Sequence, residues 1–152
     1  MAHVRTQIRD RLAKRDGTGI LFGLPTTGDR VYRSRVHPVT AGSMPGICVY
    51  CGRERSVGGT LQATEKAVDI VIDAYVAGVE YDDTADRIQV EVEDALYGDF
   101  ENRRFFGGLV TNLAYATAES KYFGNAAVSH GILRMVYEAT YKTEDGDAET
   151  AL

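Results

Sequence analysis

One alternating stretch, residues 60–76, constrains this chain more than any other part of its sequence. Apolar side chains recur there at every second position, at Val68, Ile70, Ile72, Ala74 and Val76. Asp69, Asp73 and Tyr75 occupy intervening positions. Successive side chains of a β-strand point to opposite faces of a sheet, so this pattern predicts a long strand with one buried face.

Two other stretches have the spacing of amphipathic helices. Val4, Ile8 and Leu12 repeat every four residues with arginines between them, and the glycines within residues 16–19 are expected to stop or kink that helix. A second helix is expected to open at residues 82–84, where an aspartate can cap free backbone N–H groups, and to end at Gly98. Its apolar stripe comprises Ile88, Val92, Ala95 and Leu96.

The remaining segments predict shorter elements and their connections. Strands are expected at residues 31–36, 46–51, 109–123 and 126–143, with the last two joined around Gly124 and Asn125. We expect a further helical turn at residues 20–24, a mobile charged connection at residues 52–59 and a linker at residues 99–108.

These elements together predict an α+β fold, in which two helices pack on one face of a mostly antiparallel sheet. The predicted order is α-β-β-β-α-β-β. A chain of 152 residues fits one domain, which we expect to span residues 1–143. Residues 144–152 are acidic and polar, and we expect a disordered tail there.

The charge of the chain is unevenly distributed. The net charge is −5, but residues 1–55 carry ten Arg or Lys against four acids, which leaves the remainder at −11. Basic and acidic surfaces on one chain suit head-to-tail contact between copies, although solvated faces explain such charges as well. The N-terminus is polar and the sequence has no long apolar run, so it predicts neither a signal peptide nor a membrane span. We therefore expect synthesis in a cytoplasm.

Four segments resemble the tail-terminator or minor-tail proteins of siphophages and prophages, of the lambda type. They are HVRTQIRDRLAK, GLPTTGDRVYRSRVHPV, MPGICVY and RMVYEATYKTEDGDAETAL. The expected order of helices and strands is similar to that family as well. The chain departs from the family pattern at residues 14–19, which interrupt the first helix, and at Cys48 and Cys51, where we expect aliphatic or hydroxyl side chains.

The resemblance implies a structural role in a virion. Proteins of this family are expected to cap the finished tail tube as a ring, commonly a hexamer, which stops tube growth and presents a surface to the head connector. The implied partners are copies of the chain itself, the tail tube protein and the head-tail connector or head-completion protein. The implied location is the tail or neck of the virion, after synthesis in the bacterial host cytoplasm.

Three groups of residues are candidates for partner or subunit contacts because they combine Arg with aromatic side chains or lie beside glycines. They are Arg53, Glu54 and Arg55; Arg103, Arg104, Phe105 and Phe106; and Tyr122 and Phe123. Two of these groups have a plainer alternative. Phe105 and Phe106 are also compatible with the core beneath the second helix, and Tyr122 and Phe123 with ordinary strand packing.

No catalytic, cofactor or metal site is predicted. Cys48 and Cys51 have C-x-x-C spacing, but positions three apart in a strand point to opposite faces, which favours two separate free thiols. A zinc site needs further ligands, and His3, His37 and His130 are isolated in the sequence. We expect that the chain is not an enzyme and that it binds neither a membrane nor a specific nucleic-acid sequence.

Two other functions remain open at this point. One is a different neck or head-completion protein of a tailed phage. The other is a small module that binds nucleic acid through the basic residues of the first third of the chain. The affinity of such a module falls steeply as the salt concentration rises.

Overall fold

The long strand predicted from the alternation lies in the middle of a five-stranded sheet. A computed structural model describes residues 2–14, 16–37, 40–98, 100–101, 104–124 and 129–152. The strand is β3 (Ala63–Ala77), and it pairs with β2 (Gly46–Thr60) on one side and β7 (His130–Glu144) on the other. Its 15 residues pair with β7 without any shift in register.

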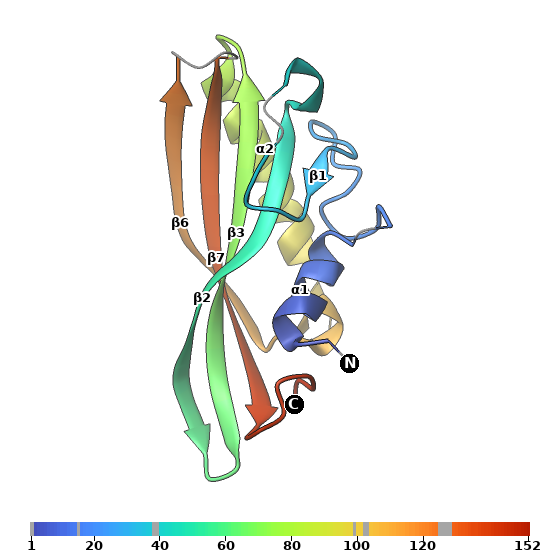
Figure 1. The fold of residues 1–152 in the computed structure, drawn as a ribbon, viewed down its shortest axis with the longest axis vertical. Helices are drawn as coiled ribbons and strands as arrows, with labels where there is room; N and C mark the ends of the chain where they lie inside the picture. Colours follow the sequence, from blue (N-terminus) through green and yellow to red (C-terminus); the bar gives the residue numbers. More distant parts are fainter. Residues whose placement is uncertain (1, 15, 38–39, 99, 102–103, 125–128) are drawn as a thin grey trace.

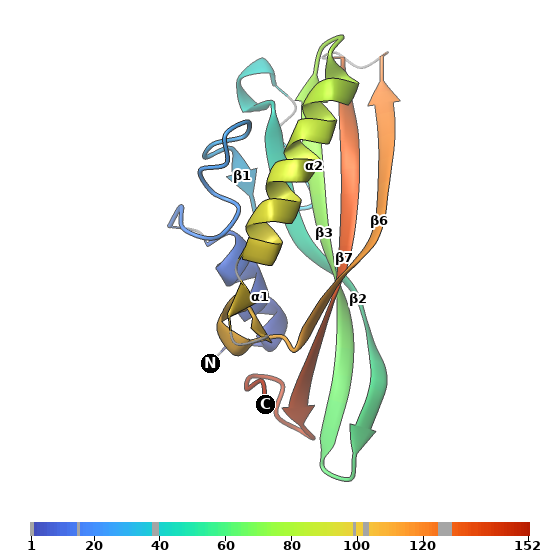
Figure 2. The same ribbon diagram turned by 180° about the vertical axis from the view of Figure 1, so that it is seen from behind.

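The sheet has the order β1-β2-β3-β7-β6, with β6 at Asn112–Phe123 and β1 at Val31–Tyr32. Only the short β1 runs parallel to its neighbour, and every other pair in this sheet is antiparallel. Both helices, α1 (Val4–Leu12) and α2 (Tyr81–Gly98), lie on one face (Figures 1 and 2). The predicted α+β class and order of elements are confirmed.

The main core lies between the helices and this face. Val68, Ile70, Ile72, Ala74 and Val76 of β3 are each at most 2% exposed, as the alternation predicts. Leu133, Met135, Tyr137, Ala139 and Tyr141 of β7 belong to the same cluster. The helices add Val4, Ile8 and Leu12 from α1 and Ala85, Ile88, Val92 and Leu96 from α2.

A glycine allows α2 to lie close to the sheet at its first turn. A Cβ atom on Gly131 of β7 would lie 2.1 Å from a ring carbon of Tyr81, the first residue of α2. The ring of Tyr81 therefore occupies the space that any side chain at position 131 requires.

The other face of the sheet, which we call the open face, is less exposed than the sequence predicts. Asp73 is 1% exposed and Tyr75 is 8% exposed, although the alternation places both opposite the buried positions. Met44, Cys48 and Tyr75 form a second small apolar cluster, against which Tyr32 and Ile132 pack. Residues from the connection between β1 and β2 thus help to bury this part of the open face.

Three local predictions are wrong. The strand expected at residues 31–36 is only Val31–Tyr32. The short strand and charged connection expected at residues 46–59 are one continuous strand, β2, in which two irregularities absorb extra residues between Cys51 and Glu54 and between Ser56 and Gly58. Pairing with β3 overrides the weak strand propensity of the glycines and charges.

The helical turn expected at residues 20–24 is also absent. The amides of Ile20 and Leu21 instead donate to the carbonyls of Arg11 and Leu12, each at 3.0 Å. The chain therefore folds back here and satisfies the last carbonyls of α1.

The linker expected at residues 99–108 contains short elements of its own. They are β4 (Phe100–Glu101), β5 (Arg104–Phe105) and a 3-10 turn at Phe106–Gly108. Another 3-10 turn, Ala41–Ser43, precedes β2.

The last residues lie near the N-terminus (Figure 1), and they contact both the first helix and the turn between β2 and β3. The carbonyl of Ala148 accepts from the amide of Val4 at 3.0 Å, and the amide of Asp145 donates to Gln62 at 2.9 Å. The division into a domain of residues 1–143 and a disordered tail stays a prediction.

We predict that Gly131→Ala destabilises the protein by about 1–3 kcal/mol, because the added methyl group must displace the ring of Tyr81. Urea unfolding measures the change. Gly98→Ala is the matched control, because a Cβ there meets nothing within 4 Å, and it is expected to be neutral or slightly stabilising. Equal stability of the two variants would contradict the close packing of α2.

Candidate assembly interface

The sheet has two long edges that no other described strand covers. β6 is the last strand of the sheet, so the whole of Asn112–Phe123 forms one outer edge, which we call the β6 edge. On the opposite side, β1 pairs only with Ile47 and Cys48 of β2. Residues 49–60 therefore form a second edge, which we call the β2 edge. Unpaired N–H and C=O groups along an edge can pair with another chain.

The first predicted group lies on the β2 edge and not in a mobile loop. Arg53 is exposed, whereas Glu54 and Arg55 are half-buried. Glu54 accepts a hydrogen bond from the hydroxyl of Tyr141 in the main core, and Arg55 forms an ion pair with Glu138 at 2.5 Å. Arg53 is thus the member of this group with the most surface to offer a partner.

The second predicted group is mostly buried where it is described. Phe105 is 8% exposed and Phe106 is 1% exposed, and both belong to the main core. The ring of Phe105 contacts Tyr97 of α2 edge-on, at 5.9 Å between centroids. Arg103 lies outside the described residues, and only the backbone of Arg104, in β5, is described. An interface role for this group stays a prediction.

The third predicted group is the end of the β6 edge. Tyr122 is 52% exposed and Phe123 is 37% exposed. Tyr122 packs against Tyr81 on the helix face, while Phe123 stacks on His130, at 5.2 Å between centroids. Each ring has one packed side and one accessible side.

The structure brings the first and third groups to opposite edges of one sheet. Sequence reasoning missed two further exposed residues of the β6 edge, Tyr115 at 46% exposure and Glu119. The low charge of residues 112–118 in an expected strand was the available signal. That signal has no meaning until the strand order shows that β6 lies at an edge.

A buried carboxylate is the main polar feature of the open face. Arg134 donates two hydrogen bonds to Asp73, from Nε to Oδ1 at 2.9 Å and from Nη2 to Oδ2 at 3.1 Å. The hydroxyl of Tyr50 donates to Oδ2 at 3.1 Å. These hydrogen bonds raise the pKa of Arg134. Burial, and then the charge of Asp73, raises the pKa of Tyr50. The cluster ties β2, β3 and β7 together.

The cysteines are separate free thiols, as the strand spacing predicts. Cys48 belongs to the small cluster on the open face, whereas Cys51 packs against the main core on the other face. Burial, and then the charge of Asp73, raises the pKa of Cys48 to about 12. Its thiol is therefore protonated near neutral pH, which is the unreactive form.

Other chemical features of the described residues are few. They contain no group of three or more His, Cys, Asp or Glu side chains arranged to hold a metal ion. A hollow of about 210 Å³ on the open face is lined by Glu119, Lys121, Phe123, Ile132 and Arg134. In the described part of the chain, no helix has the length and apolarity needed to cross a membrane.

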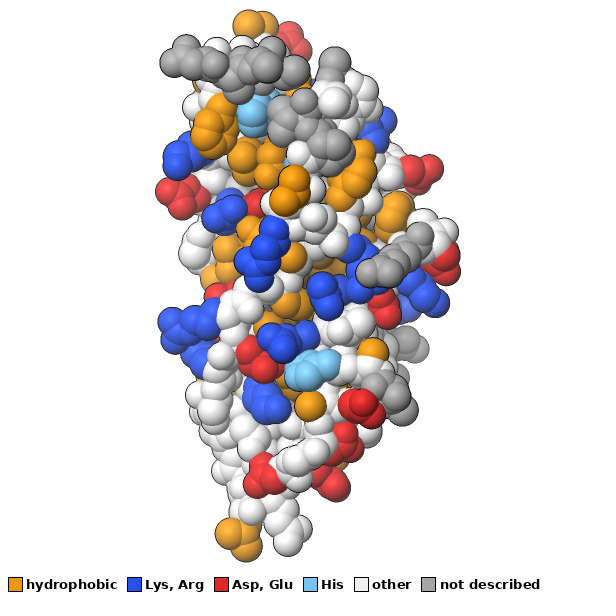
Figure 3. Space-filling view, viewed as in Figure 1, with side chains coloured by type: hydrophobic (Ala, Val, Ile, Leu, Met, Phe, Trp, Pro, Cys, Tyr) orange, Lys and Arg blue, Asp and Glu red, His pale blue; other side chains and the backbone are white. Residues whose placement is uncertain are grey.

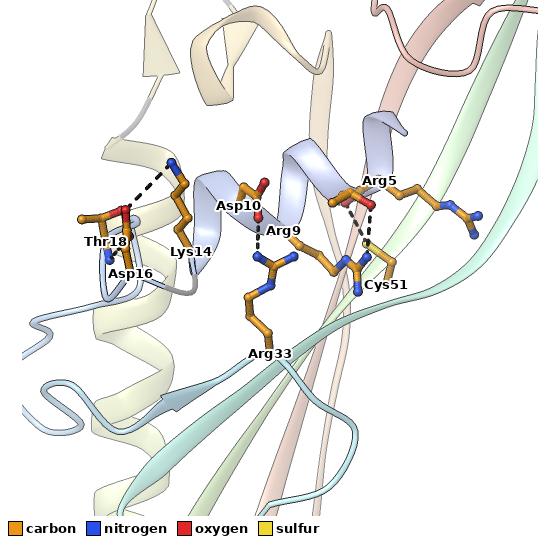
Figure 4. A network of polar contacts seen from close by, with 9 residues as sticks. Arg5, Arg9, Asp10, Lys14, Asp16, Thr18, Arg33 and Cys51 are labelled. Carbon is orange, nitrogen blue, oxygen red and sulfur yellow. Dashed lines mark hydrogen bonds and ion pairs between the residues drawn. The ribbon is translucent and has the colours of Figure 1, made fainter. Parts of the chain in front are cut away.

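Several basic residues of the first third have acidic partners. Arg33 forms an ion pair with Asp10 of α1, and Lys14 with Asp16 at 3.9 Å (Figure 4). Lys and Arg side chains gather around the middle of the face seen in Figure 3, with acidic side chains among them. Their charge is thus partly neutralised within the chain.

Comparison with known proteins yields a structural likeness. A chain from the virion of a native gene transfer agent (GTA) particle has a TM-score of 0.57 and 19% sequence identity. The match covers 93% of this chain and 92% of that chain. At this identity, the likeness shows a shared fold. No protein family model and no curated protein matches the sequence.

We predict that Arg134→Ala destabilises the protein by about 2–3 kcal/mol, because it removes the main partner of a carboxylate that is 1% exposed. The loss is smaller than for a fully buried pair, since the Arg134 side chain is 53% exposed and water can approach. Urea unfolding measures it. Arg87→Ala, at an exposed position of α2, is the control and is expected to change stability by about 0.5 kcal/mol or less. Equal losses would contradict a structural role for the Asp73 cluster.

We also predict a specific loss of stability at alkaline pH. The Cys48 thiol has a pKa of about 12 in the folded chain against 9.0 as its ordinary value, so the unfolded chain releases this proton first. Stability therefore falls as pH rises from 9 towards 12. Cys48→Ala is expected to make the slope shallower by up to about 1.4 kcal/mol per pH unit. Identical slopes in urea unfolding of the two proteins would contradict the burial of this thiol.

Proposed function

We propose that this chain is a structural protein of a tailed phage or phage-like virion, and that it works by assembly. The observation that carries the proposal is the fold likeness to a chain from a GTA virion, which extends over nearly the whole of both chains. Fold alone does not determine function, so the surface of the chain must also suit the role. The two uncovered sheet edges do so, because they offer backbone groups to other chains on both sides of the sheet.

Within that role, we propose that the chain is a tail terminator of the lambda type. Copies of it form a ring, a hexamer by the family resemblance, on the completed tail tube. The ring stops further addition of tube protein and presents the joining surface for the head connector. The chain is therefore located at the junction of tail and neck in the virion.

Unlike surfaces on the two sides of the chain support ring formation. A head-to-tail contact between unlike surfaces closes into a ring when the rotation between neighbours permits it. The β2 edge exposes Arg53, whereas the β6 edge on the opposite side of the sheet exposes Glu119. Unlike charges of this kind steer one side of a copy towards the other side of the next.

The described chemistry supports a role without catalysis. The most buried carboxylate, Asp73, is held by Arg134 and Tyr50, and the Cys48 thiol stays protonated near neutral pH. The ion pairs of Arg33, Arg55 and Lys14 favour a structural use of the basic residues over binding of nucleic acid.

Disruption of this gene in the source phage or prophage tests the proposal. Electron microscopy of the lysates is expected to show overlong tail tubes without attached heads, because nothing stops tube growth or forms the joining surface. Expression of the intact chain from a plasmid is the control and restores tails of normal length. Tails of normal length beside DNA-filled heads would contradict the terminator role and point to a connector or completion protein.

A further inference from the structure

The β6 edge has the features of a strand that another strand covers. It is twelve residues long, contains no proline or glycine, and carries only Glu119 and Lys121 as charges. Proteins usually protect exposed edges with several charges, prolines or very short strands. Tyr115, Tyr122 and Phe123 are large exposed side chains on this same strand. Left uncovered, such an edge promotes indiscriminate association.

The β2 edge matches the β6 edge in length and direction. It comprises twelve residues, from Val49, the first beyond the pairs with β1, to Thr60, the last of β2. Because β2, β3, β7 and β6 are successively antiparallel, β2 of one copy runs antiparallel to β6 of a copy placed beside it in the same sheet. Two copies can therefore continue one antiparallel sheet.

We propose that the β6 edge of each copy pairs with the β2 edge of the next copy, with Asn112 opposite Thr60 and Glu119 opposite Arg53. The partner is thus a second copy of this chain. The inference rests on the ring assembly of the proposed function and identifies the surfaces that form it.

The side chains complement each other in this register. Glu119 of β6 comes opposite Arg53, the exposed base of the β2 edge, with Arg55 at the diagonal position. Tyr115, 46% exposed, comes opposite Val57, 45% exposed. Opposite charges and aromatic–β-branched pairs across strands each contribute roughly 0.2–1 kcal/mol. The pairing also covers large side chains that a single copy leaves in water.

The register also produces the stagger that a closed barrel needs. Within one copy, Asn112 is level with Arg55 through Thr140 and Ala67, whereas in the next copy it meets Thr60. The irregularity between Ser56 and Gly58 absorbs one residue, so the shift is four paired positions, from Ala67 to Ala63 of β3, or roughly 14 Å. It accumulates over four strands that span roughly 19 Å. The resulting strand tilt of about 35° lies at the lower end of the range of roughly 35–45° found in closed barrels. A sheet that continues from copy to copy through this contact therefore curves towards a closed ring.

One existing contact lies at the upper end of the β2 edge. Arg35 donates from Nη2 to the carbonyl of Cys51 at 3.1 Å. Cys51 lies beyond the stretch from Arg53 to Thr60 that the contact uses, so this hydrogen bond and the contact of Arg35 with the Tyr50 ring at 4.6 Å can stay in place. The pairing therefore requires no change in the core.

Disulfide crosslinking of the purified full chain tests this contact. The double variant Arg53→Cys, Glu119→Cys places two new thiols opposite each other between copies, with Cβ atoms about 5 Å apart. Under mild oxidation it is expected to yield a ladder of linked multimers, at least roughly tenfold above the control. A mixture of the two single variants is expected to yield linked dimers and no longer ladder.

The matched control is Arg53→Cys combined with Val90→Cys, which carries the same number of thiols and uses a position of α2 that is 57% exposed. The unmodified chain, treated in the same way, reports linkage through Cys48 and Cys51. Multimers from the Arg53→Cys, Glu119→Cys variant at no more than the control level would overturn the edge pairing.

The crosslinking experiment and the gene disruption test different claims, and their results can be told apart. Overlong tubes after disruption, together with no specific crosslink, would retain the terminator role and reject this contact. A specific ladder together with normal tails would retain the contact and reject the terminator role.

Discussion

The uninterrupted backbone pairing between β3 and β7 is the interaction on which the rest of the structure depends. Fifteen residues of each strand pair without a shift, which fixes the face to which every side chain of both strands points. One face then becomes continuously apolar and is covered by α1 and α2. The other face receives Asp73 and Arg134 from directly opposite positions, so a buried carboxylate and its partner meet without any loop to position them.

The same pairing determines where the chain can assemble. With β3 and β7 at its centre, the sheet has β6 at one edge and residues 49–60 of β2 at the other. β6 pairs with β7 on one side of the sheet centre, and β2 pairs with β3 on the other side. The registers of these pairs fix how far the two edges are shifted relative to each other along the strand direction. The core of a single copy and the proposed contact between copies therefore arise from one register.

Periodicity predicted the elements that bury one clear face. β3, α1, α2 and the β6–β7 hairpin follow from it, because their apolar positions repeat at the spacing of a strand or a helix. The sequence predicts two pieces in place of β2, because the second half of β2 contains glycines and charges. The irregularities and the pairing with β3 depend on tertiary contacts, which no local pattern reveals. The sequence pattern predicts that Asp73 is exposed, because no local pattern reveals its pairing with Arg134, which is distant in the sequence. Of the interface candidates, residue type alone suggests Arg53, Tyr122 and Phe123, whereas Glu119 and Tyr115 become candidates only once the strand order is known.

A reconstruction by cryo-electron microscopy of the head-proximal end of the tail, from intact particles, tests the account most directly. We expect this chain in the last ring of the tube, with β6 of each copy hydrogen-bonded to β2 of the next and Glu119 beside Arg53. The same chain at another position in the particle, with its β6 edge facing solvent, would contradict both the proposed function and the proposed contact.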